Sequence, residues 1–371
     1  MLITLTPAGR FFFGGDNTFE VIKEGKVVNS ESSSYIVRSN YFPQQTTLLG
    51  MLRFLVLSQS DAFDNATQKI KNREKAKSLI GAESFSVGNR SGYESIKSIG
   101  NCFVQRKMIA EANRWKTLMI APKDDIYQID FKQASIGTFN GIELTVPDIF
   151  TEKAGKKIPY NPKEAPEMCF FTQNGDKISF SDVFTEDSRI GINKDYKGET
   201  QDSAFYKQIS YRFGKQESEY QYRFVFCAEI TEDPKKYDGS IVLLGGDNSK
   251  FVLRIEPYVE PSHTIIEKDT NGCHRVVLTS NTFVDKFVIF DFSMADTLPF
   301  RFLRTTVDTE DYNIFSQKAK RSEKFELYQT GSAFYFKKEA TLENFIKEIS
   351  SHKEFVEIGY NQYQVFINNK K

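Results

Sequence analysis

The chain has 371 residues, enough for two domains, and its 40% hydrophobic and 26% charged content predicts a folded protein and excludes a disordered one. Its 49 basic residues balance 49 acidic ones, which excludes a globally basic nucleic-acid binder. The 34 Phe residues, against a single Trp, favour sheet-rich cores because these rings pack well on pleated surfaces.

The first half of the chain mixes predicted strands and helices. Leu2–Leu5 is a short strand. Thr46–Leu57 has the apolar content of a buried helix, and either of its first two threonines is a suitable N-cap. Asn65–Ile80 is rich in Lys and predicts a surface helix. Ala154–Glu167 contains three prolines, so we expect an exposed loop there.

The second half shows clearer periodicity. Apolar and polar residues alternate in Tyr220–Cys227, Ser332–Phe336 and Tyr363–Ile367, which predicts strands. Apolar residues at helical spacing run from Leu342 to Ile349, behind Thr341 as a candidate cap. Because strands and helices do not alternate strictly, the pattern indicates an α+β fold.

Charge is distributed unevenly along the chain. Lys69–Lys116 carries eleven basic and four acidic residues, and Tyr312–Lys338 carries six and two. Pro122–Asp187 carries seven basic and twelve acidic residues. We expect one basic face that follows a phosphate backbone and one acidic face that does not.

The cysteines and the hydropathy indicate a reducing compartment. Cys102, Cys169, Cys227 and Cys273 form no CxxC pair, so we expect free thiols. The chain has no apolar run of about 18 residues and no signal peptide, which predicts a cytoplasmic protein without a membrane span.

The sequence offers no catalytic constellation. Its three histidines, His263, His274 and His352, stand in no HExxH pattern and beside no plausible nucleophile. Cys273 and His274 are neighbours, which is poor spacing for metal ligands on a strand. No phosphate-binding GxxxxGK[ST] loop is present. We therefore expect no catalytic residue, no metal and no cofactor.

One glycine turn stands in a context that suggests RNA binding. Gly331 follows the basic stretch Lys318–Lys324 and precedes the aromatic strand Phe334–Phe336. Glycine allows backbone amides to approach a phosphate closely, and aromatic rings on a sheet stack on unpaired bases. Two other turns, at Gly14–Gly15 and Gly245–Gly246, are equally compatible with ordinary hairpins.

A series of short motifs resembles the CRISPR Cmr-complex subunit three family of the RAMP superfamily. The motifs, in the order of that family, are Leu5-Thr6-Pro7 with Phe11–Phe19, Tyr41–Gln44, Leu49–Arg53, Ile80-Gly81, Ile96–Phe103, Arg189–Asn193, Ala204–Tyr206, Leu244–Asp247, Gly331–Phe336 and Ile358–Asn361. The chain departs from the family's pattern at Asn101, at Asp247-Asn248 and at Thr279–Thr282.

The resemblance implies two ferredoxin-like domains with antiparallel sheets and with hairpin and loop insertions, which we place at residues 1–200 and 201–371. The boundary is open between Ile178 and Tyr220. The resemblance also implies a non-catalytic subunit of a type III-B RNA-guided effector that binds the 5′ tag of the CRISPR RNA. Its expected partners are that RNA, the large polymerase-like Cas subunit and a RAMP backbone subunit, with no membrane.

For the RNA contacts we predict a small set of residues. Phosphates are expected at the amides around Gly331 and Ser332 and at Arg53, Arg189 and Lys207, and base edges or sugar hydroxyls at Gln44 and Asn193. In a buried helix, Arg53 could equally pair with an acid.

Two other functions remain open at this stage. The first is a RAMP endoribonuclease that processes precursor CRISPR RNA, with Tyr335 or Lys318 in place of a histidine. The second is an interaction protein without RNA contact, in which the acidic middle segment docks a basic partner.

Overall fold

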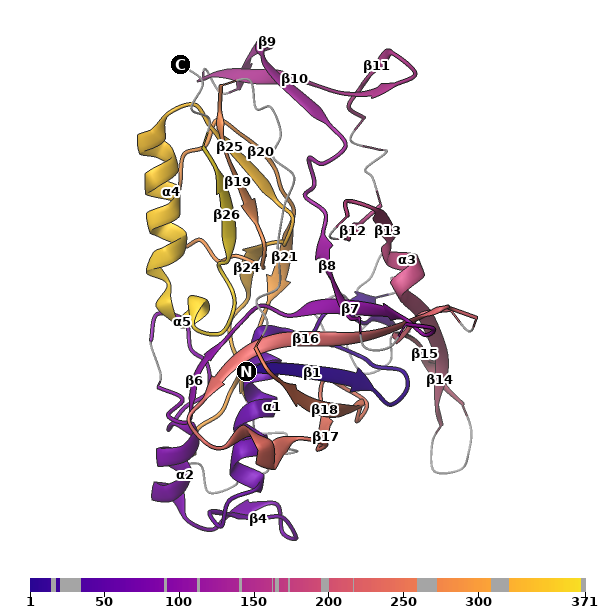
Figure 1. Ribbon diagram of the computed structural model, residues 1–371, viewed down its shortest axis with the longest axis vertical. Coiled ribbons are helices and arrows are strands. Elements are labelled where there is room, and N and C mark those ends of the chain that lie inside the picture. The colour runs from indigo at the N-terminus through magenta and orange to yellow at the C-terminus, as the bar shows by residue number, and fades with distance from the viewer. Residues whose placement is uncertain are drawn as a thin grey trace.

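The computed structural model, shown in Figure 1, describes residues 1–14, 18–20, 35–89, 92–111, 114–139, 142–161, 163, 167–172, 174–194, 200–215, 217–258, 272–307 and 320–367. The fold is α+β and rich in antiparallel sheet, as the sequence predicts. Among these described residues, no helix is long and apolar enough to cross a membrane.

The main sheet joins strands from both halves of the chain. In spatial order its strands are β13 (Lys177–Ser179), β12 (Cys169–Phe171), β8 (Lys116–Ile120), β7 (Phe103–Met108), β16 (Tyr220–Ile230), β1 (Leu2–Pro7), β18 (Lys250–Glu256) and β17 (Ile241–Leu243), with β6 (Ile96–Ile99) also paired to β16. Helix α1 (Gln45–Ser58) covers one face, where its leucines belong to the same buried apolar cluster as Leu5 and Phe224. Helix α2 (Arg73–Ile80) lies beside α1.

A second sheet forms after residue 272. Its order is β20 (Phe292–Met294), β25 (Ala333–Phe336), β19 (His274–Leu278) and β26 (Tyr363–Phe366). Helix α4 (Glu339–Ser351) packs on one face through Phe345, and α5 (Lys353–Val356) follows it. The other face is covered by β9 (Gln128–Phe139), whose Phe131 ring has its centroid 5.7 Å from that of Tyr335.

The two sheets share one strand order. Numbered along the chain, β18-β1-β16-β7 and β26-β19-β25-β20 both read 4-1-3-2, with every neighbouring pair antiparallel. A division of the chain at residue 200 would cut the first of these sheets between β7 and β16.

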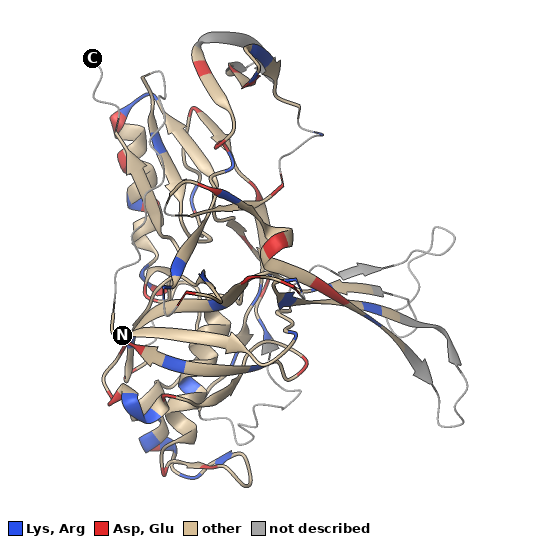
Figure 2. Cartoon of the chain, turned by 45° about the vertical axis from the view of Figure 1, so that its right-hand side comes forward, with Lys and Arg blue, Asp and Glu red and all other residues tan. Residues whose placement is uncertain are grey.

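Hairpins extend from this core. One sheet contains β9 (Gln128–Phe139), β10 (Ile142–Lys153) and β11 (Lys156–Pro159), and another contains β14 (Phe184–Lys194), β15 (Thr200–Phe213), β3 (Tyr35–Arg38) and β2 (Thr18–Glu20). Short elements are β4 (Phe63–Asp64), β5 (Lys69–Ile70), α3 (Phe180–Val183), η2 (Pro234–Tyr237), β21 (Thr297–Phe300), β22 (Leu303–Arg304), β23 (Lys320–Arg321) and β24 (Phe325–Tyr328). The β14–β15 hairpin, which we call the arm, extends away from the rest of the molecule (Figures 1 and 2).

Most predicted elements are confirmed. The strands at β1, β16, β25 and β26 and the helices α1 and α4 lie where the periodicity places them. The predicted helix over Asn65–Ile80 is wrong in its first half. There the chain forms the β4–β5 hairpin, and the helix begins only after Asn72, whose side chain accepts a hydrogen bond from the Lys75 amide.

Three local predictions need correction. Lys338, and not Thr341, is the N-cap of α4, and the Thr341 hydroxyl donates to the Lys338 carbonyl at 2.7 Å. The N-cap of α1 is Gln44, without a side-chain hydrogen bond. The described residues of the predicted loop at 154–167 are mostly exposed, but they include the strand β11, which pairs with β10.

Candidate nucleic-acid interface

The Gly331 turn lies inside the protein. Its φ of +88° is a conformation that favours glycine, and an added Cβ would lie 2.8 Å from the Ala121 carbonyl oxygen. The Gly331 amide donates to the Leu278 carbonyl, and the Gly331 carbonyl accepts from the Lys123 amide, both at 2.8 Å. The amide that we expected to bind a phosphate is therefore occupied within the fold.

Ser332, the next residue, is fully buried, and its own amide donates to the Gln329 carbonyl. Within the described residues the Ser332 hydroxyl has no hydrogen-bond partner. An unpaired buried hydroxyl costs stability, so this side-chain atom lowers the stability of the turn.

A buried ionic cluster supports the segment that covers this turn. Asp124 is fully buried and accepts two hydrogen bonds from Arg275 of β19, at 2.8 and 2.6 Å. The Tyr335 hydroxyl donates to the same carboxylate. Burial, reinforced by the negative charge of Asp124, raises the pKa of Tyr335. The phenol therefore stays protonated, and the cluster ties the β8–β9 connection to the second sheet.

Arg53 is also occupied within the protein. It is only 3% exposed, and its guanidinium donates from Nε to the Ile80 carbonyl at 2.9 Å and from Nη2 to the Gly81 carbonyl at 3.3 Å. These carbonyls end α2, where a cation is favourable because of the helix dipole. The structure thus gives Arg53 carbonyl partners within the fold. Gln44, which is half-buried, is the N-cap of α1.

Arg189 and Lys207 lie on the arm, and both are exposed. Arg189 of β14 is opposite Gln208 of β15, whereas Lys207 is opposite Ile190. Because directly opposite residues share a face and successive residues alternate, Arg189 and Lys207 project from opposite faces of the arm. In this arrangement a single phosphate cannot contact both Arg189 and Lys207. Asn193 lies at the irregularity between Ile192 and Lys194, and its side chain is outside the described part of the structure.

The arm also carries an aromatic ring, Tyr206, which ends the Ala204–Tyr206 motif but was not among the predicted RNA contacts. Tyr206 is opposite Gly191 in the register, and a Cβ added at Gly191 would lie 2.0 Å from a carbon of the Tyr206 ring. The ring therefore lies flat over the glycine, yet 38% of Tyr206 remains exposed. It shares its face of the arm with Arg189. The sequence signal was a glycine within an otherwise regular strand.

The base of the arm is fixed by polar and aromatic contacts. Arg38 of the neighbouring strand β3 forms an ion pair with Glu186 at 2.6 Å, and its guanidinium lies 3.5 Å from the Tyr211 hydroxyl. Tyr211 stacks on Tyr41 with ring centroids 4.6 Å apart. Burial raises the pKa of Tyr211, so its hydroxyl remains protonated. The arm thus leaves the core from a well-packed base.

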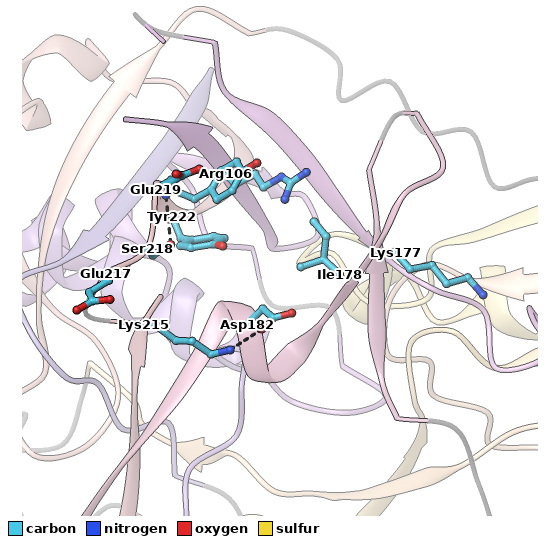
Figure 3. Close-up of a pocket in the computed structure, with 10 residues that line it drawn as sticks. Arg106, Lys177, Ile178, Asp182, Lys215, Glu217, Ser218, Glu219 and Tyr222 are labelled. Atoms are coloured by element: carbon cyan, nitrogen blue, oxygen red, sulfur yellow. Dashed lines mark hydrogen bonds and ion pairs between the residues drawn. The ribbon is translucent and has the colours of Figure 1, made fainter. Parts of the chain in front are cut away.

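A cavity of about 640 Å³ opens beside this base (Figure 3). Its charged lining consists of Arg106, Lys177, Lys215, Asp182, Glu217 and Glu219. Lys215 and Asp182 form an ion pair at 2.7 Å, and the Arg106 guanidinium lies 4.6 Å from the centroid of the Tyr220 ring. Three cations and three acids cancel, so charge alone does not make this cavity a phosphate site.

The basic stretch Lys69–Lys116 does not form one face. Its first part surrounds α2, where Lys75 and Lys77 form ion pairs with Asp61 and Glu74. Its last part lies on β7 and β8 of the main sheet. Figure 2 shows the basic residues of α2 well separated from the arm.

The described residues contain no group of three or more side chains that could hold a metal ion. His352 lies 3.0 Å from Glu348 and against the Phe283 ring. His274 begins β19, whereas Leu278, the partner of the Gly331 amide, ends it, roughly 13 Å away along the strand. His263 and Lys318 lie outside the described residues. His274 is thus not placed to act as an acid or base at the glycine turn.

The fold is similar to that of chains in solved structures. A chain in a cryo-EM structure of the type III-B Cmr-beta complex bound to cognate target RNA has a TM-score of 0.50 and 14% identity, covering 98% of this chain and 96% of that chain. A chain of the same complex with target RNA and AMPPnP has the same identity and coverage, with a TM-score of 0.49. No curated protein matches.

The family comparison is independent of this likeness in fold. The model of the CRISPR-associated protein (Cas_Cmr3) family matches residues 172–367, which is more than half of the chain. The match includes the arm, β16, β18 and the whole second sheet. The chain therefore belongs to the CRISPR-associated Cas_Cmr3 family.

Proposed function

We propose that this protein is a non-catalytic subunit of a type III-B RNA-guided effector complex and that it holds the 5′ tag of the CRISPR RNA. The observation that carries the proposal is the family match over residues 172–367. The solved relatives support it, because they are parts of a type III-B Cmr complex bound to target RNA. A cytoplasmic location follows from this role.

The arm is the element that we propose to bind the tag. Arg189 and Tyr206 share one face, so a phosphate at the guanidinium and a base on the exposed ring can belong to neighbouring nucleotides. Lys207 on the other face would hold a phosphate further along the strand, and Asn193 at the irregularity would meet a base edge. Such an RNA wraps around the arm.

The remaining predicted residues are proposed to act less directly. Gln44, half-buried at the start of α1, is accessible enough to contact a sugar hydroxyl. Arg53, Gly331 and Ser332 are buried, so we propose that they set the shape of the surface that the RNA meets. Arg53 does this through the end of α2, and Gly331 through its close contact with Ala121.

We further propose that the two sheets of order 4-1-3-2 are the two ferredoxin-like units of the family. Each has a helix beside it, α1 in the first and α4 in the second. On this proposal the boundary falls between β18 and β19 instead of at residue 200. The large polymerase-like Cas subunit and a RAMP backbone subunit would dock on surfaces that the arm leaves accessible.

A crosslinking experiment tests this function. The complex is assembled with a guide RNA that carries 4-thiouridine either in the tag or near the 3′ end, and it is then irradiated. The proposal predicts crosslinks from the tag to this subunit, with peptides from residues 184–213, and none from the 3′ label. Tag crosslinks that map only to other subunits would overturn it, and so would metal-independent cleavage of repeat RNA by the purified chain.

A further inference from the structure

The main sheet carries an aromatic platform on the face turned away from α1. Trp115, the only tryptophan of the chain, directly precedes β8 and is half-buried. Two residues later Thr117 is opposite Gln105 of β7, which is in turn opposite Arg223 of β16. Since Val104 and Leu118 point into the core beneath α1, these alternating residues point to the other face.

The indole lies on a guanidinium. The central carbon of Arg223 is 4.0 Å from the centroid of the Trp115 ring, which is the distance of a close cation–π contact. The ammonium of Lys107 is 5.1 Å from the same centroid. Trp115 therefore reaches across β7 to a side chain two strands away.

The guanidinium beneath the ring is held in place from several sides. Arg223 is only 5% exposed. Arg223 donates to Gln105 Oε1 from Nε at 3.0 Å and from Nη2 at 2.8 Å. It also donates from Nη2 to Glu256 Oε2 at 2.9 Å. Arg223 Nη1 and Glu256 Oε1 form an ion pair at 2.5 Å, which neutralises the charge of the guanidinium. These in-plane bonds use the edge of the guanidinium and leave its flat face to the indole.

From this arrangement we infer a second RNA contact: an unpaired nucleotide stacks its base on Trp115. Stacking needs a flat ring that is fixed before binding, because ordering a mobile side chain would consume part of the gain. Arg223, Gln105 and Glu256 supply that fixed base. The inference rests on the proposed function, since it assumes that the protein handles single-stranded RNA.

Cations lie near the ring, and this combination favours a nucleotide over an acidic peptide as the ligand. Arg114, which directly precedes the indole, is exposed, whereas Lys116 is opposite Arg106 and projects from the other face of the sheet. Lys107 has a flexible stem, so its ammonium can move from the ring to a neighbouring phosphate. A ring for the base and cations for its phosphates occur together here, whereas an acidic peptide would use only the cations.

The single tryptophan makes the test direct. The full chain is titrated with an eight-nucleotide oligoadenylate and, separately, with an eight-unit abasic ribose-phosphate oligomer of the same charge. Oligoadenylate is expected to quench the Trp115 fluorescence and to bind more tightly. The abasic oligomer is expected to leave the fluorescence nearly unchanged, because it has no base to stack.

Variants separate stacking from packing. Trp115→Leu still covers Arg223 but has no π face, so oligoadenylate affinity, measured by anisotropy of a labelled strand, should fall roughly 5- to 150-fold. Trp115→Phe keeps a ring and should recover most of the lost affinity.

A second pair of variants tests the phosphate contact. Lys107→Ala should reduce the salt slope by about 0.7, as for one lost phosphate contact. Lys250→Ala is the matched control, an exposed cation on β18, three strands away from the Lys107 strand β7 on the same sheet, and should change neither value.

The outcomes separate this inference from the proposed function. Equal binding of the abasic oligomer with no effect of Trp115→Leu would overturn the inference, and so would equal quenching by an octaglutamate peptide, which would indicate a protein-docking surface. If tag crosslinks in the assembled complex persist in those cases, the proposed function stands. If oligoadenylate quenches Trp115 while the tag crosslinks elsewhere, the proposed function fails and the platform stands.

Discussion

The arm and the Gly331 turn were predicted to serve the same RNA, yet their physical settings are opposite. The arm extends into solvent and exposes Arg189, Tyr206 and Lys207. The turn is buried, and both backbone groups of Gly331 are hydrogen-bonded to other parts of the chain. A glycine with positive φ permits close backbone approach, but at Gly331 the group that approaches is the Ala121 carbonyl and not a ligand.

The difference shows how to separate the two roles by experiment. A residue that the fold uses should change the free energy of unfolding when it is replaced. A residue that only the RNA uses should change affinity and leave stability as it was. The following substitutions apply this criterion, and the first is expected to have the largest effect.

Asp124→Asn should destabilise the protein most, by about 3–5 kcal/mol, because it leaves the buried Arg275 guanidinium without its counter-charge. Urea unfolding of the purified chain measures this loss. Asp296→Asn is the matched control, since Asp296 is mostly exposed in its ion pair with Lys123 and should cost less than about 1 kcal/mol. Equal losses for both variants would contradict the importance of burial in the cluster.

Gly331→Val should cost about 2–4 kcal/mol, because a β-branched residue is strained at positive φ and its Cβ would press on the Ala121 carbonyl. The measurement is again the free energy of unfolding, compared with the tag affinity of the assembled complex. Gly88→Val is a control with positive φ but open space around the Cβ position, so it should cost less. A stable Gly331→Val protein with weakened RNA binding would reverse our assignment of the turn.

Glu348→Gln probes a place on α4 where a side chain accepts hydrogen bonds from backbone amides of the fold. Burial opposes ionisation of Glu348, but the Lys286 amide, His352 and the Asp285 amide together hold the pKa of Glu348 below its ordinary value. The stabilisation is therefore present above the pKa of an unfolded glutamate and is lost as the pH falls through the lowered folded value.

The variant should accordingly lose about 1–2 kcal/mol at pH 7, and its difference from the wild type should shrink in acid. Urea unfolding of the variant and the wild type at pH 7 and in acid gives the difference in the free energy of unfolding under each condition. Glu343→Gln, an exposed position on α4, serves as the control. A difference that stays constant with pH would contradict the role of the charge.

Arg189→Glu should have the smallest effect on stability, below about 0.5 kcal/mol, because the side chain is exposed. Its effect should appear in RNA binding, where loss of one phosphate contact reduces the salt slope by about 0.7. Lys347→Glu on α4 makes the same charge change away from the arm. An unchanged affinity and slope would remove Arg189 from the interface.

Part of this architecture is readable from local sequence. The alternation in β16 and the helical spacing in α4 predict those elements, because each depends on which side of one element is apolar. The exposed nature of the 154–167 segment follows from its composition. The ordered motifs point to the family that the match over residues 172–367 confirms.

The tertiary structure decides what each predicted site residue contacts. The register of β14 with β15 places Arg189 and Lys207 on opposite faces. Ala121 packs against Gly331, and the Lys123 amide donates to the Gly331 carbonyl. Arg53 donates to the carbonyl of Ile80 at the end of α2. These outcomes depend on pairings between segments far apart in the chain, so no local pattern contains them. Residue type sets what a side chain is able to bind, but the neighbours that folding brings to it determine whether it is already bound.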